Sequence, residues 1–558
     1  MPSWGIHVCN SHVHLLAPLF NSDDAALPAL LDPGFVHTLA SYLALPDSVI
    51  KHTTQSFRAF QHKDTNINQI PLSIVVPQLA RLTPELRYLV EYYDKAVCPS
   101  MVIYDGPTNP YRSHILQLAF EDEALMEAVY ALASSHLQQK RRREQPAERG
   151  SRTLPFSSGS SSRSSASPQT PPQYIAAGHS LGNSTNNIIS SALRHKNAAI
   201  KLLNDQLSNT SRVVTDSAMA TLLVICVYHV CETGIGQFRT HFAGVKKLVE
   251  MRGVGVGLDV GEETGKWGWM ETVFTWMDNL SATVNNREAQ LGGEYVEMVA
   301  GTKGEWGLES LVGCERGLFK MLAGLPGINM LSQQTLVRES GLGLGKFEGD
   351  ERKEFWREWN VLRNDLAMWE PADQYAPTSL RQNSTNSTYE YYSPSGLGFD
   401  TAPASPVTPT TSTRPSFLHD VAAQEIHRFH ASNVYRYAAI LYLHRLAYPD
   451  LPSDHYIFQD VVRDIIFHLG GVPSSAPLAK ALVWPVFVTG AECVGEEDRK
   501  VVKERCESMW RDGGFWNKVV GGKVLEEVWK EEDAGVGRKG GLRWGRVVGR
   551  EMGEVLVM

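Results

Sequence analysis

The hydrophobic positions between Ser191 and Arg252 follow a helical period and predict three consecutive helices. In the middle helix, which we expect to begin near Thr215, apolar side chains from Ala218 to Val230 occupy nearly every side. Such a helix cannot face water, so other helices must surround it. The pattern therefore predicts an all-α fold, a large multi-helix bundle or solenoid-like array.

The helical period returns on both sides of this stretch. Thr83-Pro84-Glu85 predicts a helix start, with Thr83 as the cap and Pro84 at the first helical position. Further helices are predicted over residues 125–136, 273–284, 355–369, 423–446, 461–469, 479–493 and 499–510. The alternation of apolar and polar residues that indicates a strand is not found along the chain, so the prediction stays all-α.

Composition divides the chain into ordered and unordered parts. Residues 1–80 form a poorly specified leader with weak helical periodicity, and residues 81–533 form the predicted helical domain. Two stretches within that domain, about 140–187 and 371–415, are rich in Ser, Thr and Pro. Such stretches cannot bury enough apolar area to offset the entropy of ordering, so we expect two disordered inserts. Residues 534–558 are expected to form a Gly-rich basic tail.

Length, charge and cysteine content narrow the class of protein. The 558 residues are 43% hydrophobic, which allows a sizeable core, and the net charge of −8 argues against binding a polyanion through bulk electrostatics. No signal peptide or bilayer-spanning apolar run is found, so we expect no membrane association. Seven scattered cysteines indicate reduced thiols in an intracellular protein. Cys226 and Cys231 point about 140° apart on one helix, which makes a shared metal or a disulfide improbable.

The sequence shows no catalytic or metal-binding constellation. Gly341–Lys346 resembles a phosphate loop only superficially, because it lacks the Gly-Lys-Ser/Thr ending and no strand precedes it. Cys9, His12 and His14 have no second ligand pair nearby to complete a metal site. We therefore expect no catalytic residues, no cofactor-binding residues and no metal ligands.

A run of four basic residues, Lys140-Arg141-Arg142-Arg143, ends the helix that precedes the first expected insert. One interpretation is a solvated basic helix end, which complements the negative end of the helix dipole. The other is a nuclear-import signal, since the run lies beside a segment expected to be disordered. The residues alone favour neither interpretation.

Several stretches, taken in order, resemble the fungal-specific transcription factor domain, the helical regulatory region usually found downstream of a binuclear zinc cluster. The most specific pieces are Ala192–Ala199 and His241–Leu248, and Val483–Gly490 and Glu526–Trp529 match the later helices and the end. Each piece alone is an amphipathic pattern, but their order and spacing over roughly residues 85–533 make the match strong. The resemblance implies a nuclear, non-enzymatic regulator of RNA polymerase II transcription.

The resemblance also has implications for zinc, DNA and partners. The family's zinc cluster needs six cysteines, opening Cys-x2-Cys-x6-Cys, whereas only Cys9 precedes Cys98 here. We expect zinc only if a six-cysteine cluster is missing from this gene prediction, and no direct DNA binding by the chain as given. The expected partners are the transcription machinery or other zinc-cluster factors, with a homodimer as a further option. A small effector in an apolar pocket between helices is also expected.

Two other functions stay open at this point. A helical enzyme or small-molecule-binding protein could reuse the same scaffold, and turnover of a small molecule by the purified chain would favour it. A DNA-binding-deficient partner could instead pair with zinc-cluster factors and titrate them. A six-cysteine reading frame just upstream of Met1 would exclude the second alternative.

Overall fold

The computed structural model describes residues 79, 81–144, 183–208, 215–236, 238–251, 268–301, 306–339, 348–370, 416–535, 542–545, 547–548 and 554–557. Most of the expected leader, most of the first expected insert and the whole of the second lie outside these residues. The same holds for Cys9, His12, His14 and the glycine-rich motif at Gly341–Lys346.

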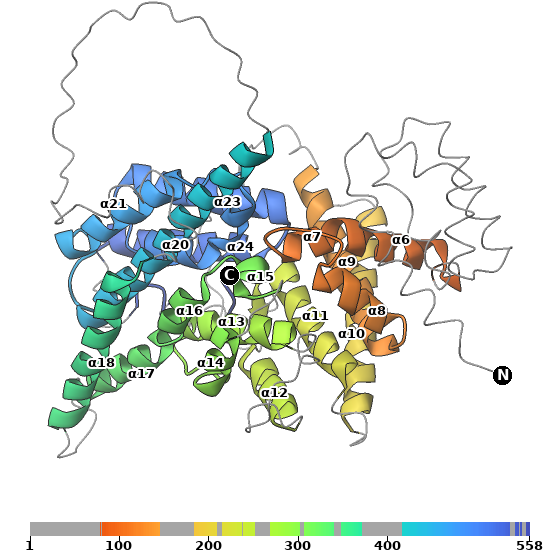
Figure 1. Cartoon of the computed structure of the whole chain (residues 1–558), viewed down its shortest axis with the longest axis horizontal. Helices are drawn as coiled ribbons and strands as arrows, with labels where there is room; N and C mark the ends of the chain where they lie inside the picture. The colour runs from red at the N-terminus through yellow and green to blue at the C-terminus, as the bar shows by residue number, and fades with distance from the viewer. Residues whose placement is uncertain are drawn as a thin grey trace, which may run out of the picture.

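The first group of helices contains the apolar helix α11 together with helices that pack against it. Its members are α6 (Pro84–Tyr92), η4 (Tyr93–Val97), α7 (Cys98–Met101), η5 (Tyr111–Ile115), α8 (Leu116–Ala119), α9 (Glu123–Glu144), α10 (Asn183–Leu207), α11 (Asp216–Glu232) and α12 (Phe238–Met251). Helix α9 packs against both α10 and α11, and the group forms one end of the molecule (Figure 1). The side chain of Thr215 caps α11 by accepting a hydrogen bond from the Ala218 N–H at 3.3 Å, which confirms the predicted start.

Burial along α11 confirms that other helices enclose it. Every residue from Ala218 to Tyr228 is buried, and Leu222 and Ile225 retain 8% and 2% of their exposed surface. The apolar face predicted for the following helix is buried as well, from Phe238 to Val249. The surrounding helices thus remove from water an apolar surface that α11 could not expose on its own.

The remaining helices form the centre and the opposite end of the molecule (Figure 1). They are α13 (Gly268–Val284), α14 (Glu294–Gly301), α15 (Leu308–Val312), α16 (Arg316–Leu322), α17 (Leu325–Glu339), α18 (Glu348–Met368), α20 (Ser416–Ala447), α21 (Tyr456–Gly470), η8 (Pro477–Ala481), α22 (Val483–Gly490), α23 (Glu496–Gly513) and α24 (Asn517–Asp533). The all-α prediction is confirmed, and none of the helices in the described residues is long and apolar enough to cross a bilayer.

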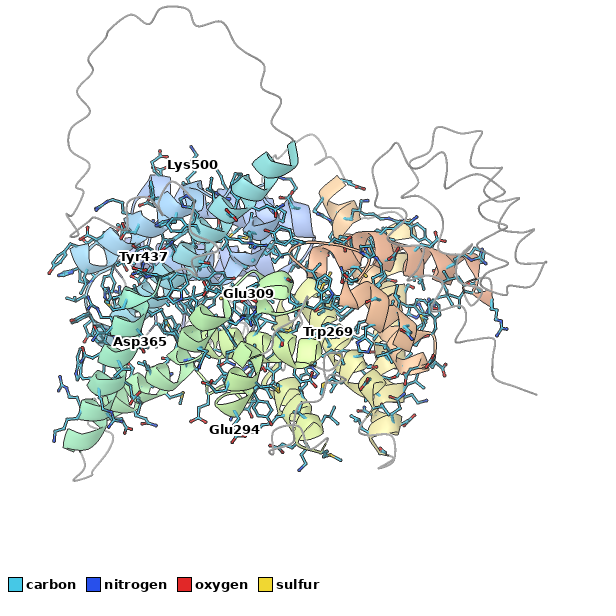
Figure 2. The ribbon with its side chains drawn as sticks, viewed as in Figure 1. Trp269, Glu294, Glu309, Asp365, Tyr437 and Lys500 are labelled. Carbon is cyan, nitrogen blue, oxygen red and sulfur yellow. The ribbon has the colours of Figure 1, made fainter. Side chains whose placement is uncertain are left out.

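Both ends of the molecule share one hydrophobic core. Buried apolar side chains form a single cluster that runs from Leu79 to Val557. Figure 2 shows Trp269 where α13 meets the N-terminal group, and its indole N–H donates to His114 Nδ1 at 3.0 Å. Glu294 and Lys500, in contrast, are exposed on the outside of the body (Figure 2). Since the core is continuous, the described helices form one packed body.

The C-terminal residues complete this core. Strand β2 (Glu554–Val555) pairs antiparallel with β1 (Ile235–Gly236), a two-residue ladder too short to leave an alternating pattern in the sequence. Trp544 is buried, and its indole N–H donates to the Val284 carbonyl at 3.0 Å. The described residues of the range 534–558, expected above to be a Gly-rich basic tail, are therefore part of the packed body.

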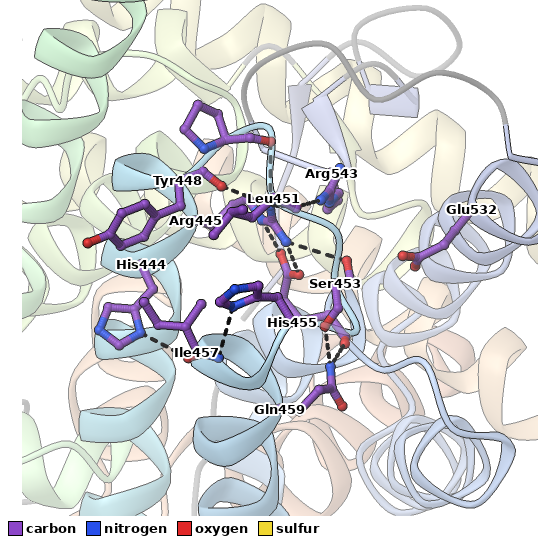
Figure 3. Close-up of polar contacts among 12 residues, drawn as sticks. His444, Arg445, Tyr448, Leu451, Ser453, His455, Ile457, Gln459, Glu532 and Arg543 are labelled. Atoms are coloured by element: carbon purple, nitrogen blue, oxygen red, sulfur yellow. Dashed lines mark hydrogen bonds and ion pairs between the residues drawn. The ribbon is translucent and has the colours of Figure 1, made fainter.

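A buried ion pair fixes the loop between α20 and α21 (Figure 3). Arg445 is 1% exposed, and its guanidinium donates to both carboxylate oxygens of Glu492, at 2.7 and 2.5 Å. The remaining N–H groups donate to the carbonyls of Tyr448 (3.1 Å) and Leu451 (2.7 Å) and to the Ser453 hydroxyl (3.4 Å). Such complete pairing is what allows two charges to stay buried.

Candidate ligand-binding pocket

A cavity of two parts lies where α7, η8, the end of α23 and the start of α24 meet. Both spaces open to solvent; the larger one, called the outer chamber, has a volume of about 430 Å³ and includes Asp512 in its lining. The inner slot encloses about 100 Å³. Ser100, Lys480 and Gly513 line both spaces, so the outer chamber and the inner slot adjoin one another.

The walls of the inner slot are largely apolar. They include Val227 and Val230 from α11, Trp276 and Met277 from α13, and Phe515 from the turn before α24. Helices from three parts of the chain therefore meet at this space, and α11 contacts both α13 and α24. An apolar cavity with a few polar groups is the usual form of a small-molecule site.

Lys480 is the first polar group of the cavity. It lies in η8, within the apolar run 478–488, and its Nζ donates to the Pro99 carbonyl at 2.9 Å. Burial lowers the pKa of this ammonium to about 8, an effect that the negative charge of Asp105 opposes in part. Lys480 thus carries a poorly solvated positive charge at the junction of the two spaces.

Lys518 is the second polar group and the more deeply buried one. It lies in the first turn of α24, is 6% exposed, and its Nζ lies 4.9 Å from the centre of the Phe515 ring. Burial lowers its pKa to about 8, and the charge of nearby Lys480 acts in the same direction. A cation at a helix N-terminus also opposes the helix dipole, so this position favours a negative partner.

The charges around Lys518 are not balanced within the described residues. The groups acting on its pKa are Lys480, Arg143 and the Cys231 thiol, and no carboxylate is among them. Asp105 is engaged by Arg112, whose guanidinium donates to its two oxygens at 3.0 and 3.1 Å. In the part of the chain that the structure describes, the inner slot therefore holds excess positive charge.

A left-handed turn at Gly514 and a neutral histidine, His136, hold Gly513, which lines both parts of the cavity. Gly514 ends α23 with φ of 75°, and its N–H donates to the Trp510 carbonyl at 2.8 Å. The His136 Nε2–H donates to the Gly513 carbonyl at 3.0 Å, and its Nδ1 accepts from the Tyr92 hydroxyl at 3.0 Å. Burial lowers the pKa of His136 to about 4, so the ring is neutral and adds no charge.

Replacing Gly514 by Ala should destabilise the protein by about 2 kcal/mol, because a left-handed conformation and a close contact coincide there. A Cβ at this position would lie 2.8 Å from His136 Nε2. Gly535→Ala is the matched control, since φ is 62° there and nothing lies within 4 Å, and it should cost only about 1 kcal/mol. Chemical denaturation measures both. Equal losses would show that the contact with His136 has no energetic effect.

The basic run predicted from the sequence lies next to this turn. Arg143 donates to the carbonyls of Trp510 (3.4 Å) and Arg511 at the end of α23, and Arg142 lies over the Trp516 ring at 5.7 Å. Lys140 is exposed and 3.9 Å from Glu144, and Arg141 is half-buried. Since α9 continues to Glu144, all four residues are helical. Whether they also form an import signal stays a prediction.

Metal-binding and thiol chemistry find no support in the described residues. No group of three or more His, Cys, Asp and Glu residues that could hold a metal occurs there. The six described cysteines are free thiols and buried, and burial raises the pKa of the Cys226 and Cys231 thiols to about 12. Such thiols stay protonated and unreactive at neutral pH.

The two lysines of the cavity were not predicted from the sequence. Lys480 lies between Ala479 and Ala481 in an apolar run, and Lys518 lies between Asn517 and Val519, with apolar residues on both sides of that pair. A lone lysine among buried apolar residues is the signal that could have found them, since lysine is almost never fully buried without a partner.

Comparison with known proteins gives one family and one distant relative. Residues 87–558 match the family described as "Fungal specific transcription factor domain". The chain is also 32% identical over 79 residues to "Acriflavine sensitivity control protein acr-2" from Neurospora crassa, a match that covers 13% of this chain and 13% of that protein. No solved structure matches the chain.

Proposed function

The chain belongs to the family of the fungal-specific transcription factor domain, and we propose that it regulates transcription by RNA polymerase II in the nucleus. The observation that carries the proposal is the extent of the family match, which begins in α6 and includes nearly the whole described body. That family is one of regulatory domains, so the chain acts through binding rather than catalysis.

DNA contact is proposed to come from a zinc cluster outside these 558 residues, either on the same polypeptide or on a partner. In the sequence at hand, only Cys9 precedes Cys98, and the net charge is −8. The helical body would then contact other zinc-cluster factors, a second copy of itself or the transcription machinery. The molecule would act through the binding of these partners to its surface rather than through a catalytic centre.

A small effector bound in the two-part cavity is proposed to regulate this activity. The cavity walls come from α7, from α11 and α13, and from η8, α23 and α24, so a bound molecule would contact helices from three parts of the chain. A ligand that binds one arrangement of these helices more tightly shifts the population towards it. Such a shift would alter the surfaces offered to partners.

A tethered reporter assay tests regulation itself. The chain is fused to a heterologous DNA-binding domain, and reporter output is compared with that of the DNA-binding domain alone at equal nuclear abundance. We expect the fusion to change output by about fivefold or more in either direction. Output indistinguishable from the DNA-binding domain alone would contradict the proposed function.

Import through the basic run makes a separate prediction. Changing Lys140 and Arg141 together to Ala should lower the nuclear fraction of a fluorescent fusion with little change in its melting temperature, because in the described residues neither side chain forms a hydrogen bond or ion pair with α23. Arg143→Ala is the contrasting variant, since it removes the hydrogen bonds to the end of α23 and should lower the melting temperature. Normal nuclear entry of the double variant would exclude the import role.

A further inference from the structure

We propose that the two-part cavity binds a small organic monocarboxylate, with its carboxylate between Lys480 and Lys518 and its apolar tail against Val230 and Trp276. This inference rests on the proposed function only in naming the class of effector, because the binding itself is independent of transcription.

The positive charge of the cavity favours the binding of an anionic ligand. Two ammonium groups line the inner slot, and within the described residues neither forms an ion pair. Lys480 donates one hydrogen bond to the Pro99 carbonyl, which leaves further N–H groups for a ligand. Lys518 is only 6% exposed. A carboxylate would supply the partner that a buried ammonium requires.

The shape of the cavity and the position of Asp512 favour a ligand that carries a single negative charge. The inner slot holds both lysines together with the apolar side chains of α11 and α13, which suit one charged head and one apolar tail. The outer chamber carries the Asp512 carboxylate. A second anionic group on the ligand, placed in that chamber, would lie near the negative charge of the exposed Asp512, which disfavours it.

The lowered pKa values of both lysines agree with this geometry. Burial makes each ammonium costly in the ligand-free protein. A bound carboxylate favours the charged form of both groups, and protonation and anion binding therefore support each other. A neutral or cationic molecule of the same shape offers no such gain.

The probes are three molecules of matched shape: 4-phenylbutyrate, 4-phenylbutan-1-ol and 4-phenylbutylamine. Isothermal titration calorimetry on the purified full chain measures their affinities at pH 7. We expect the carboxylate to bind with a Kd of about 1 mM or lower, and the alcohol about tenfold or more weakly. The amine should show no binding, because the ammonium groups of Lys480 and Lys518 repel it.

Three variants locate the site. Lys518→Met and Lys480→Met should each weaken 4-phenylbutyrate binding by about tenfold or more. Lys523→Met is the matched control, since it removes the same charge from an exposed position of α24, and it should leave the affinity unchanged. Lys518→Met should also melt at the same or a higher temperature than the wild type. If Lys518→Met keeps its stability but loses binding, Lys518 contacts the ligand and is not needed for the fold.

Four outcomes would overturn the inference. They are no binding of 4-phenylbutyrate at about 10 mM, equal affinity for the alcohol, unchanged affinity in both lysine variants, or equal loss in Lys523→Met. None of these outcomes affects the tethered reporter assay, so failure of the pocket and failure of the proposed function are distinguishable. If Lys518→Met does not fold, Lys480→Met decides the result, because Lys480 is only half-buried.

Discussion

Replacing Glu492 by Leu should lower the free energy of unfolding by about 3–5 kcal/mol, the largest effect expected in this molecule. The substitution leaves the Arg445 guanidinium 1% exposed with no counter-ion, held by uncharged partners: the Tyr448, Pro449 and Leu451 carbonyls, the Ser453 hydroxyl and the Phe458 ring. Uncompensated burial of one charge costs far more than the pair contributes. Urea denaturation monitored by circular dichroism measures the loss.

A double-mutant cycle distinguishes burial of an unpaired charge from loss of packing. Arg445→Met combined with Glu492→Leu removes both charges and should recover much of the stability that the single variant loses. Glu527→Leu is the exposed control, since its ion pair with Lys530 lies on the surface and should contribute at most about 1 kcal/mol. A double variant as unstable as Glu492→Leu would show that packing, not charge, dominates at this site.

Replacing Lys518 by Met should stabilise the ligand-free protein by about 3 kcal/mol at pH 7, which is the second large effect. Burial lowers the pKa of Lys518 to about 8 in the folded protein, whereas an unfolded lysine titrates near about 10.4. Below pH 8 the ammonium is charged in both states, and the folded state bears the full cost of its burial. Between these two pKa values the unfolded state binds more protons, so the folded state gains stability as pH rises.

The difference between variant and wild type therefore shrinks with pH, to about 1 kcal/mol at pH 10. The difference is the quantity to measure, because other groups near Lys518 titrate in both proteins. These are Lys480 and Cys231, whereas Arg143 stays charged and His136 stays neutral over this range; the buried Cys231 thiol has the opposite effect, since its raised pKa lowers stability as pH rises. A difference that stays constant from pH 7 to 10 would contradict the burial of a charged Lys518.

Hydrophobic periodicity predicted most of the fold because the helices are long and their apolar faces are wide. The start of α11 at Thr215 and the buried face of α12 followed directly from residue spacing. Helix α24 was missed, since Gly521 and Gly522 lower helix propensity in its first half. The C-terminal residues pack on this helix at ordinary contact distance, since a Cβ on Gly521 would lie 3.5 Å from Val557 and 3.6 Å from Phe487.

The candidate site was far less predictable, because it depends on contacts between segments distant in sequence. Lys480 and Lys518 lie near one another only after η8 and α24 have packed against α7 and α11. The Lys140–Arg143 run was visible in the sequence, but its contacts with the end of α23 were not. Residue type identified the charges, and tertiary packing decided which of them are buried.

The reporter output of the tethered Lys518→Met variant is the most direct test of the central claim, that the two-part cavity controls a regulatory helical body. The account predicts a folded protein, at least as stable as the wild type, whose reporter output differs from the wild type by about threefold or more. The Lys523→Met fusion should match the wild type. Equal output from both variants and the wild type, at equal nuclear abundance, would contradict control by the cavity.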